Sequence, residues 1–178
     1  LKLDRDVLVL NFASAKHPGG AWLNGAKAQE EDLCRCSSLF SSLITQNSYY
    51  VNNINCGTSL YTDDIIYSPM VPFFREDDTM QLCDMFKMSV ITSPAPNVNN
   101  LSEDEEFENL EDVIYNRAMK IFSVANKQGH RSIVLGAWGC GVFGNDPEMI
   151  IGAFKNALSK INNFDNIYFA VYDPSPTQ

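Results

Sequence analysis

Two segments of this sequence share one order of features: an apolar run, then a glycine-rich stretch, then the start of a helix. The first segment covers residues 6–31 and the second covers residues 131–148. An uninterrupted apolar run such as DVLVLNFA (6–13) is typical of a strand that is buried on both faces of a sheet, whereas a half-exposed strand alternates. Strands that alternate with helices in this way predict an α/β fold, with helices covering a largely parallel or mixed sheet.

The remaining elements are predicted from periodicity. Apolar residues at three- and four-residue spacing (Leu33, Cys36, Phe40, Leu43) predict one helix with a single apolar stripe after the first loop. Residues 47–62 are expected to be loop, and short strands are expected at 65–69, 71–74 and 88–92. Prolines in the first two of these strands confine them to sheet edges or strand ends.

Helix signals predict the second half of the chain. A helix over 105–128 is expected to end at Gly129, and the acidic run at 103–106 is expected to be solvated. Asp146 as a cap followed by Pro147 predicts a helix that continues to residue 160, and 166–172 is expected to be a final buried strand. No repeat or interdomain linker interrupts the 178 residues, which predicts one domain.

The composition narrows the possible partners. There are 22 Asp and Glu against 13 Lys and Arg, so the net charge is −9 and direct nucleic-acid binding is not expected. No apolar run reaches about 18 residues, so we expect no membrane partner. The five cysteines form no Cys-x-x-Cys pair, and the histidines are His17 and His130, so we expect no metal site. Reduced thiols predict an intracellular, cytoplasmic protein, or a nuclear one if the source is eukaryotic.

The two glycine-rich segments suggest a site for an anionic ligand at the carboxyl ends of the strands. Residues 139–145 offer backbone N–H groups in front of a helix N-terminus, which suits a diphosphate, although the pattern fits neither a Walker loop nor a dinucleotide fingerprint. Phe143 in this segment either fills the core or stacks on a ligand. In the first segment, Glu30 and Glu31 either stabilise the helix start or supply a carboxyl of raised pKa for glycosidic chemistry. Adjacent helical side chains diverge by about 100°, so one of the two is expected to face the reacting bond.

These residues carry a resemblance to a known family. The run NFASAKHPGGAWLNGAKAQEEDLCR resembles the signature of the bacterial-type poly(ADP-ribose) glycohydrolases, a branch of the macrodomain superfamily. Their hallmark is a Gly-Gly-Gly loop followed closely by Gln-Glu-Glu. The resemblance continues through LYTDDIIYSPMVPFFRED, ITSPAPN and HRSIVLGAWGCGVFGNDP to FAVYDPSP, and so covers nearly the whole chain.

The resemblance implies a three-layer α/β/α macrodomain with a mixed central sheet, spanning residues 1–178 as one catalytic domain. The family usually has a helical segment before the first strand, and we expect that segment to be missing here. The implied activity is hydrolysis of the ribose–ribose O-glycosidic bonds of poly(ADP-ribose), with release of ADP-ribose and without a cofactor or metal. The implied partners are poly(ADP-ribose) or an ADP-ribosylated protein.

The resemblance also implies residue roles. Glu31 would be the catalytic acid, and Glu30 would hold the ribose hydroxyls and support Glu31. Substrate-binding positions would be Asn11, Gly19, Gly20, Ala21, Gln29, Gly139, Gly141, Val142, Phe143, Gly144 and Asn145. The adenine pocket is expected near the first strand, without named residues.

One position departs from the family pattern: Ala21 stands where the hallmark has its third glycine. If the backbone there requires a positive φ, strain of about 1–2 kcal/mol follows and the approach to the diphosphate loosens. Two alternatives therefore stay open. One is a binding module that recognises ADP-ribose without turnover, and the other is a mono-ADP-ribosyl hydrolase with the same residues.

Overall fold

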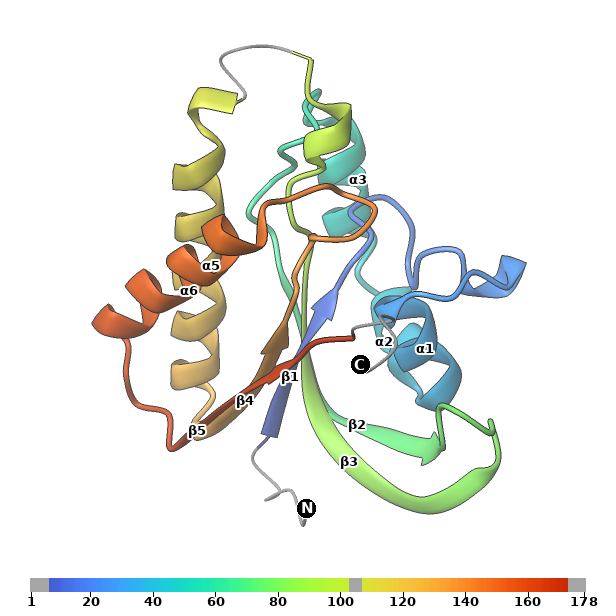
Figure 1. The fold of residues 1–178 in the computed structure, drawn as a ribbon. Coiled ribbons are helices and arrows are strands. Elements are labelled where there is room, and N and C mark those ends of the chain that lie inside the picture. Colours follow the sequence, from blue (N-terminus) through green and yellow to red (C-terminus); the bar gives the residue numbers. More distant parts are fainter. Residues whose placement is uncertain (1–6, 103–106, 173–178) are drawn as a thin grey trace, which may run out of the picture.

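The computed structural model describes residues 7–102 and 107–172 as a five-stranded sheet between two layers of helices (Figure 1). The strands are β1 (Val7–Phe12), β2 (Ile66–Arg75), β3 (Leu82–Ser93), β4 (Ser132–Gly136) and β5 (Asn166–Ala170). Their order in the sheet is β2-β3-β1-β4-β5. β1 is parallel to β3 and β4, β4 is parallel to β5, and β2 is antiparallel to β3. The α/β class and the mixed sheet are thus confirmed.

The helices separate into two groups, one on each face of the sheet (Figure 1). One layer holds α5 (Leu110–Lys127) and α6 (Pro147–Lys160), and the other holds α1 (Gln29–Cys36), α2 (Leu39–Leu43) and α3 (Asn47–Asn55). Two 3-10 turns, η1 (Trp22–Asn24) and η2 (Val98–Asn100), lie in loops. Leu8, Leu10 and Ile133 belong to the core under α5 and α6, and Val90 belongs to the core under α1–α3. Val7 and Val9, on the opposite face of β1 from Leu8 and Leu10, are buried as well, so β1 is buried on both faces, as its apolar run predicts.

The predicted end of α5 and the predicted start of α6 are confirmed. The Asp146 carboxylate accepts a hydrogen bond of 2.9 Å from the backbone N–H of Glu148, directly ahead of Pro147 at the start of α6. Gly129, two residues past α5, has a φ of 81°. The acidic run at 103–106 lies outside the described residues.

The single helix predicted after the first loop is wrong, because Ser37 divides it into α1 and α2. Ser37 is extended, forms an isolated bridge with Phe73 of β2, and donates its hydroxyl to the Leu33 carbonyl at 2.6 Å. The backbone N–H of Ser38 donates to Pro72. Backbone groups of Ser37 and Ser38 therefore bond to the edge strand β2, whereas in a continuous helix they would bond within the helix.

The predicted loop over 47–62 is also partly wrong, since residues 47–55 form α3. Their helix propensity is low, but the helix buries Tyr49, Tyr50 and Asn53 against the sheet. Tertiary packing thus decides the conformation of this segment.

Three strand predictions are corrected in extent or burial. The two short strands expected around 65–74 are one strand, β2, with a register shift between Ser68 and Val71 and a φ of 50° at Met70. β2 lies at the sheet edge, as its prolines predict. β3 begins at Leu82, well before the expected residue 88. The described residues of β5 are exposed rather than buried, because β5 is the other edge strand.

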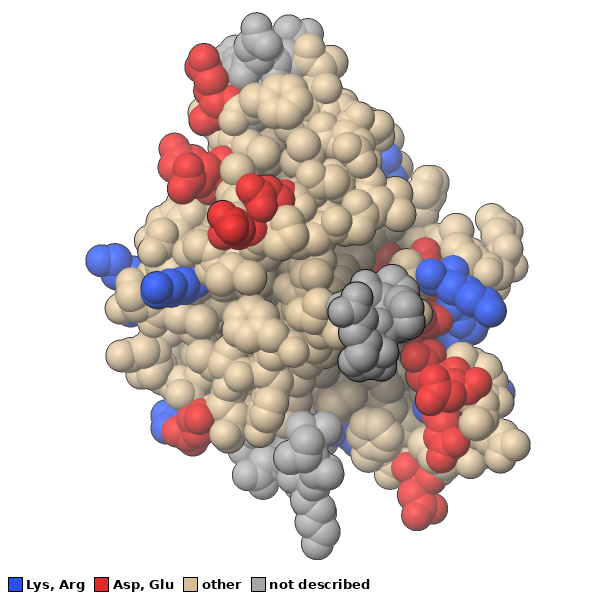
Figure 2. All heavy atoms as spheres, in the orientation of Figure 1, with Lys and Arg blue, Asp and Glu red and all other residues tan. Residues whose placement is uncertain are grey.

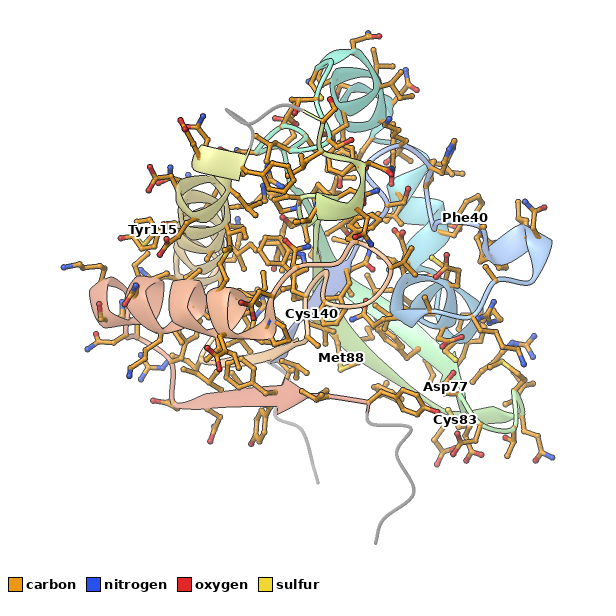
Figure 3. The ribbon with its side chains drawn as sticks, turned by 45° about the horizontal axis from the view of Figure 1, so that its top comes forward. Phe40, Asp77, Cys83, Met88, Tyr115 and Cys140 are labelled. Carbon is orange, nitrogen blue, oxygen red and sulfur yellow. The ribbon has the colours of Figure 1, made fainter. Side chains whose placement is uncertain are left out.

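Acidic side chains dominate the charged surface. Figure 2 shows Asp and Glu gathered at the upper left and lower right of one face, with Lys and Arg at the left edge and beside the lower-right group. The cysteines are free, and two of them, Cys34 and Cys36, belong to α1; Figure 3 labels Cys83 on β3 and Cys140 in the loop after β4. Among the described residues, every helix is too short or too polar to cross a membrane.

Candidate active site

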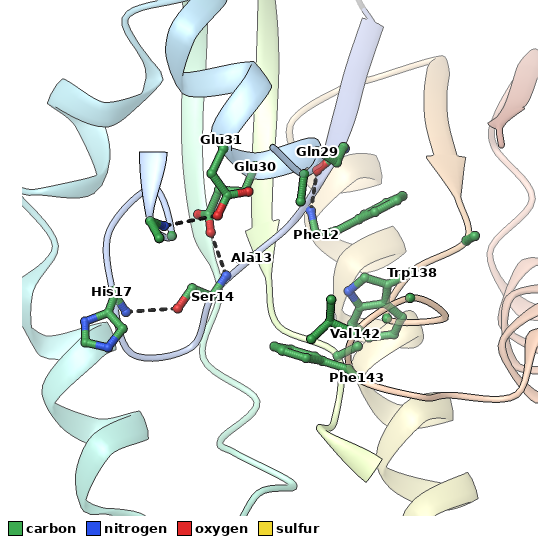
Figure 4. Close-up of a pocket in the computed structure, with 17 residues that line it drawn as sticks. Phe12, Ala13, Ser14, His17, Gln29, Glu30, Glu31, Trp138, Val142 and Phe143 are labelled. Atoms are coloured by element: carbon green, nitrogen blue, oxygen red, sulfur yellow. Dashed lines mark hydrogen bonds between the residues drawn. The ribbon is translucent and has the colours of Figure 1, made fainter. Parts of the chain in front are cut away.

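A cavity of about 390 Å³ lies at the carboxyl ends of β1 and β4, between the two glycine-rich loops (Figure 4). Parallel strands place the loops that follow them at one edge of the sheet, so residues far apart in the sequence meet there. The lining residues are Phe12, Ala13, Ser14, His17, Gly20, Ala21, Ala28, Gln29, Glu30, Glu31, Ala95, Ala137, Trp138, Gly139, Gly141, Val142 and Phe143.

Glu30 is a buried carboxyl in the wall of this cavity. Its Oε1 accepts a hydrogen bond of 3.1 Å from Asn11 Nδ2, and its Oε2 accepts one of 2.6 Å from the Ser14 backbone N–H. Burial raises the pKa of Glu30 to about 7, and the nearby Glu31 adds to the rise, while the hydrogen bonds from Ser14 and Asn11 oppose it. The expected rise in pKa of one carboxyl in the pair is thus found at Glu30. A carboxyl with this pKa exchanges its proton near neutral pH.

Glu31 lies beside Glu30 and contacts the first glycine-rich loop. Its Oε1 accepts a hydrogen bond of 3.0 Å from the Ala21 backbone N–H. Gly20 has a φ of 62°, and a Cβ there would overlap the Glu31 carboxylate. Glycine at this position therefore lets the backbone pass close to Glu31.

Ala21 itself has a φ of −110°, which any residue adopts without strain. The strain that a positive φ would have caused at this position is absent. Replacement of the third hallmark glycine by alanine thus leaves the loop geometry intact.

Gln29 fastens the start of α1 to the end of β1. Its Oε1 accepts a hydrogen bond of 2.8 Å from the Phe12 backbone N–H, and its Nε2 donates one of 2.7 Å to the Leu10 carbonyl. The side-chain amide takes the place of a neighbouring strand at this point. It therefore sets the position of Glu30 and Glu31 relative to the sheet.

The second glycine-rich loop offers three consecutive donors to the cavity. Within residues 7–102 and 107–172, the backbone N–H groups of Gly141, Val142 and Phe143 have no hydrogen-bond acceptor. All three residues line the cavity. Successive free N–H groups form a concave site for an anion such as a diphosphate. In the first loop, by contrast, the Gly20 and Ala21 N–H groups already donate to His17 and Glu31.

Asn99 and Asn145 hold this second loop in place. Asn99 Nδ2 donates to the Val142 carbonyl at 2.9 Å, and its backbone N–H donates to the Phe143 carbonyl at 3.2 Å. Asn145 Nδ2 donates to the carbonyls of Pro96 and Gly139 at 2.8 and 3.0 Å. Both side chains thus join the loop to the segment after β3.

The cavity brings together most of the sequence-predicted site residues. Asn11, Gly19, Gly144 and Asn145 do not line it; Asn11 and Asn145 are buried behind its walls. Phe143 both lines the cavity and packs on the edge of the core, so its two expected roles are compatible.

Other lining residues were not predicted. Ser14, His17 and Ala95 lie within segments that carry the family resemblance, but no role was predicted for them. Phe12 at the end of the first strand could have been found from the expected location of the adenine pocket. Within the described part of the chain, no three His, Cys, Asp or Glu side chains are placed to hold a metal ion.

Comparisons with known proteins agree on one family. A family model described as "Microbial-type PARG, catalytic domain" matches residues 2–76. The structure of poly(ADP-ribose) glycohydrolase from Thermomonospora curvata bound to the inhibitor ADP-HPD is 42% identical with a TM-score of 0.90, over 96% of this chain and 66% of that one. The enzyme from Deinococcus radiodurans in complex with ADP-ribose is 42% identical with a TM-score of 0.91, over 98% of this chain and 72% of that one. No curated protein matches. The chain thus spans about two thirds of the length of the T. curvata enzyme.

Proposed function

The chain belongs to the microbial-type poly(ADP-ribose) glycohydrolase family, and we propose that it hydrolyses the ribose–ribose O-glycosidic bonds of poly(ADP-ribose) and releases ADP-ribose. One observation carries the proposal: the buried Glu30–Glu31 pair lies across a cavity from three free backbone N–H groups. A carboxyl beside an anion site is what cleavage of a bond next to a diphosphate-linked ribose needs.

The free N–H groups of residues 141–143 bind the diphosphate in this proposal. Phe143 packs against the ribose whose anomeric carbon reacts, and Glu30 accepts hydrogen bonds from the ribose hydroxyls. Asn11 orients Glu30 through its side-chain amide. The substrate is then held on both sides of the cavity, and the glycosidic bond lies next to Glu31.

Glu31 acts first as an acid and then as a base. Its proton passes to the departing hydroxyl oxygen while the bond between that oxygen and the anomeric carbon breaks. The positive charge that develops on the anomeric carbon is stabilised by the nearby diphosphate. Glu31, now a carboxylate, removes a proton from the incoming water, whose oxygen bonds to the anomeric carbon. The products are ADP-ribose and a chain that is one unit shorter.

The geometry of Ala21 bears on the alternative of a binding module without turnover. That alternative rested on strain at Ala21, and its φ of −110° removes the strain. Intact carboxyls at positions 30 and 31 are also what a hydrolase requires. Hydrolysis is therefore the function that the site supports best.

The substrate is tested by incubating the protein separately with purified poly(ADP-ribose) and with a mono-ADP-ribosylated protein, and by identifying the products chromatographically. We expect ADP-ribose from the polymer. Release from the mono-modified protein alone would contradict the proposal and favour a mono-ADP-ribosyl hydrolase. Tight ADP-ribose binding in a calorimeter, with no release from either substrate, would favour a binding module.

A further inference from the structure

We propose that Lys16 and Tyr61 form a subsite for the nucleotide on the leaving side of the scissile bond, that is, the polymer unit from which ADP-ribose is cut. This inference rests on the proposed function. The two side chains come from different loops, and Lys16 Nζ lies 5.8 Å from the centre of the Tyr61 ring. Neither lines the cavity, but each adjoins a residue that does: Lys16 precedes His17 in the chain, and Tyr61 is a ring neighbour of Phe143.

Lys16 is held on the Glu31 side of the cavity. The Ser14 hydroxyl accepts hydrogen bonds from the backbone N–H groups of Lys16 and His17, at 3.3 and 3.1 Å, which fixes this turn. Figure 4 shows Ser14 and His17 on the same side of the pocket as Glu31, with Phe12 and Trp138 on the other. Lys16, between Ser14 and His17 in the chain, therefore belongs to the turn on the Glu31 side of the cavity.

Tyr61 lies near the second glycine-rich loop. Its ring centre is 6.3 Å from that of Phe143, which lines the cavity. A substrate ribose packed on Phe143 therefore has Tyr61 as its next aromatic neighbour. Tyr61 is half-buried, so part of its ring remains accessible.

The backbone of Tyr61 is strained, with a φ of 62° that a bulky residue rarely adopts. Arg117, fully buried in α5, holds it there: its guanidinium donates to the Leu60 carbonyl at 3.0 Å and to Asp63 Oδ1 at 3.0 Å. Backbone strain that buried contacts maintain beside a cavity is typical of functional sites. We take the strain at Tyr61 as a sign that its ring is positioned to contact a ligand.

A second cavity of about 250 Å³ extends away from Lys16. Asn53, Gly57, Ser59 and Asn100 contribute to its lining. The subsite therefore combines the aromatic ring of Tyr61, the ammonium group of Lys16 and the polar second cavity that Lys16 lines. A nucleotide matches these features, because its base stacks on aromatic rings and its phosphate pairs with an ammonium group.

The charge of the molecule supports this assignment. With a net charge of −9 and two carboxyls in the cavity, the protein repels a polyanionic chain at most of its surface. A lysine on the Glu31 side of the cavity offsets that repulsion where the polymer continues beyond the cut bond. Lys16 and Tyr61 thus favour polymer over free ADP-ribose.

The test compares binding of ADP-ribose with binding of a fluorescent poly(ADP-ribose) oligomer of fixed length. Glu31→Gln serves as the parent, because binding can then be measured without hydrolysis. Lys16→Gln and Tyr61→Asn are added separately; asparagine tolerates the positive φ while removing the ring. Tyr61→Phe keeps the ring, and Lys155→Gln on the exposed side of α6 is the matched charge control.

We expect Lys16→Gln and Tyr61→Asn each to weaken oligomer binding about fivefold or more, with ADP-ribose binding unchanged. Tyr61→Phe and Lys155→Gln should behave as the parent does. Equal losses for oligomer and ADP-ribose, or no loss for either, would overturn the subsite. So would a parent that binds the oligomer no more tightly than ADP-ribose, and this result would leave the proposed hydrolysis standing. Failure of wild type to release ADP-ribose from polymer would instead count against the proposed function.

Discussion

At the scale of single residues, the site depends on a few contacts around two adjacent carboxyls. Glu30 is enclosed by Asn11 and the Ser14 backbone, whereas Glu31 contacts Ala21 in the glycine-rich loop. The same residue type therefore has two environments one position apart. In the proposed mechanism Glu30 holds the ribose hydroxyls and Glu31 transfers the proton.

Gly20→Ala tests the close approach of the first loop to Glu31. The added methyl would overlap the Glu31 carboxylate and would require a positive φ, so the carboxylate must move. We expect ADP-ribose release to fall at least about tenfold and the free energy of unfolding to fall by about 1–2 kcal/mol.

The matched control is Ala21→Gly, whose backbone is unstrained in either form. It should retain activity and lose about 0.5–1 kcal/mol at most from its free energy of unfolding. Enzyme assays and denaturant titration measure both quantities. If the Gly20→Ala protein is active and fully stable, the first glycine-rich loop does not contact the Glu31 side chain.

The buried Glu30 predicts a pH dependence of stability. Its pKa is about 7 in the folded protein against 4.5 as the ordinary value, so between these pH values the folded state binds more protons than the unfolded chain. The free energy of unfolding should therefore decrease as pH rises from about 4.5 to 7, by up to about 3 kcal/mol.

Glu30→Gln should remove this decrease of the free energy of unfolding with pH. The substitution can also change the free energy of unfolding by an amount that is the same at every pH. Denaturant titrations of both proteins at several pH values between about 4.5 and 7.5 measure the difference. Parallel pH profiles for wild type and Glu30→Gln would contradict the raised pKa.

At the scale of elements, the cavity requires two strand-to-helix loops to stay at a fixed separation. Gln29 sets the start of α1 against β1. Asn99 and Asn145 set the loop after β4 against the segment after β3. The proposed donors for the diphosphate therefore depend on residues outside their own loop.

Asn99→Ala should loosen the second loop. It removes the hydrogen bond to Val142, and an Asn99 oxygen lies only 2.5 Å from where a Gly144 Cβ would be, so the packing is close. We expect the Kd for ADP-ribose to rise about three- to tenfold, with a nearly unchanged melting temperature. Asn156→Ala, at an exposed position of α6, is the control for calorimetry. If both variants change the Kd for ADP-ribose equally, Asn99 does not hold the second loop in its binding conformation.

The sequence was most informative where local signals and burial agree. The run 6–13, the Asp146–Pro147 helix start and the Gly129 helix end all match the structure. Prediction failed where tertiary contacts determine the local conformation. Ser37 interrupts a helix because it pairs with β2. Residues 47–55 are helical because the helix buries two tyrosines.

The same limit applies to the site. The carboxyl pair and the glycine-rich loops follow from motifs, and the cavity contains both. Ser14, Asn99 and Arg117 act through hydrogen bonds to residues that are distant in sequence or to ordinary loop backbone, and no local pattern marks them. Only the folded arrangement identifies them.

At the scale of the whole molecule, an acidic protein is proposed to act on a polyanion. A net charge of −9 does not favour attraction by a broad basic surface, so in the proposed recognition backbone N–H groups and a single lysine hold the polymer locally. Recognition should then concentrate at one end of the substrate.

Binding of poly(ADP-ribose) should therefore depend weakly on salt. Each phosphate neutralised by a cation contributes a slope of about −0.7 for single strands, so one lysine predicts a slope of log K against log salt between about −0.5 and −1.5. Fluorescence titration of the Glu31→Gln variant between about 50 and 300 mM salt measures it. A slope steeper than about −4 would indicate a broad basic surface and contradict local recognition.

The central claim is that Glu31 transfers the proton that breaks the glycosidic bond. Its most direct test is the rate of ADP-ribose release from poly(ADP-ribose) by wild type and by Glu31→Gln, alongside Glu111→Gln on the exposed face of α5. We predict a loss of about 10²–10⁴-fold for Glu31→Gln alone, with ADP-ribose still bound with wild-type affinity. If Glu31→Gln keeps more than about a tenth of the wild-type rate, Glu31 is not the acid.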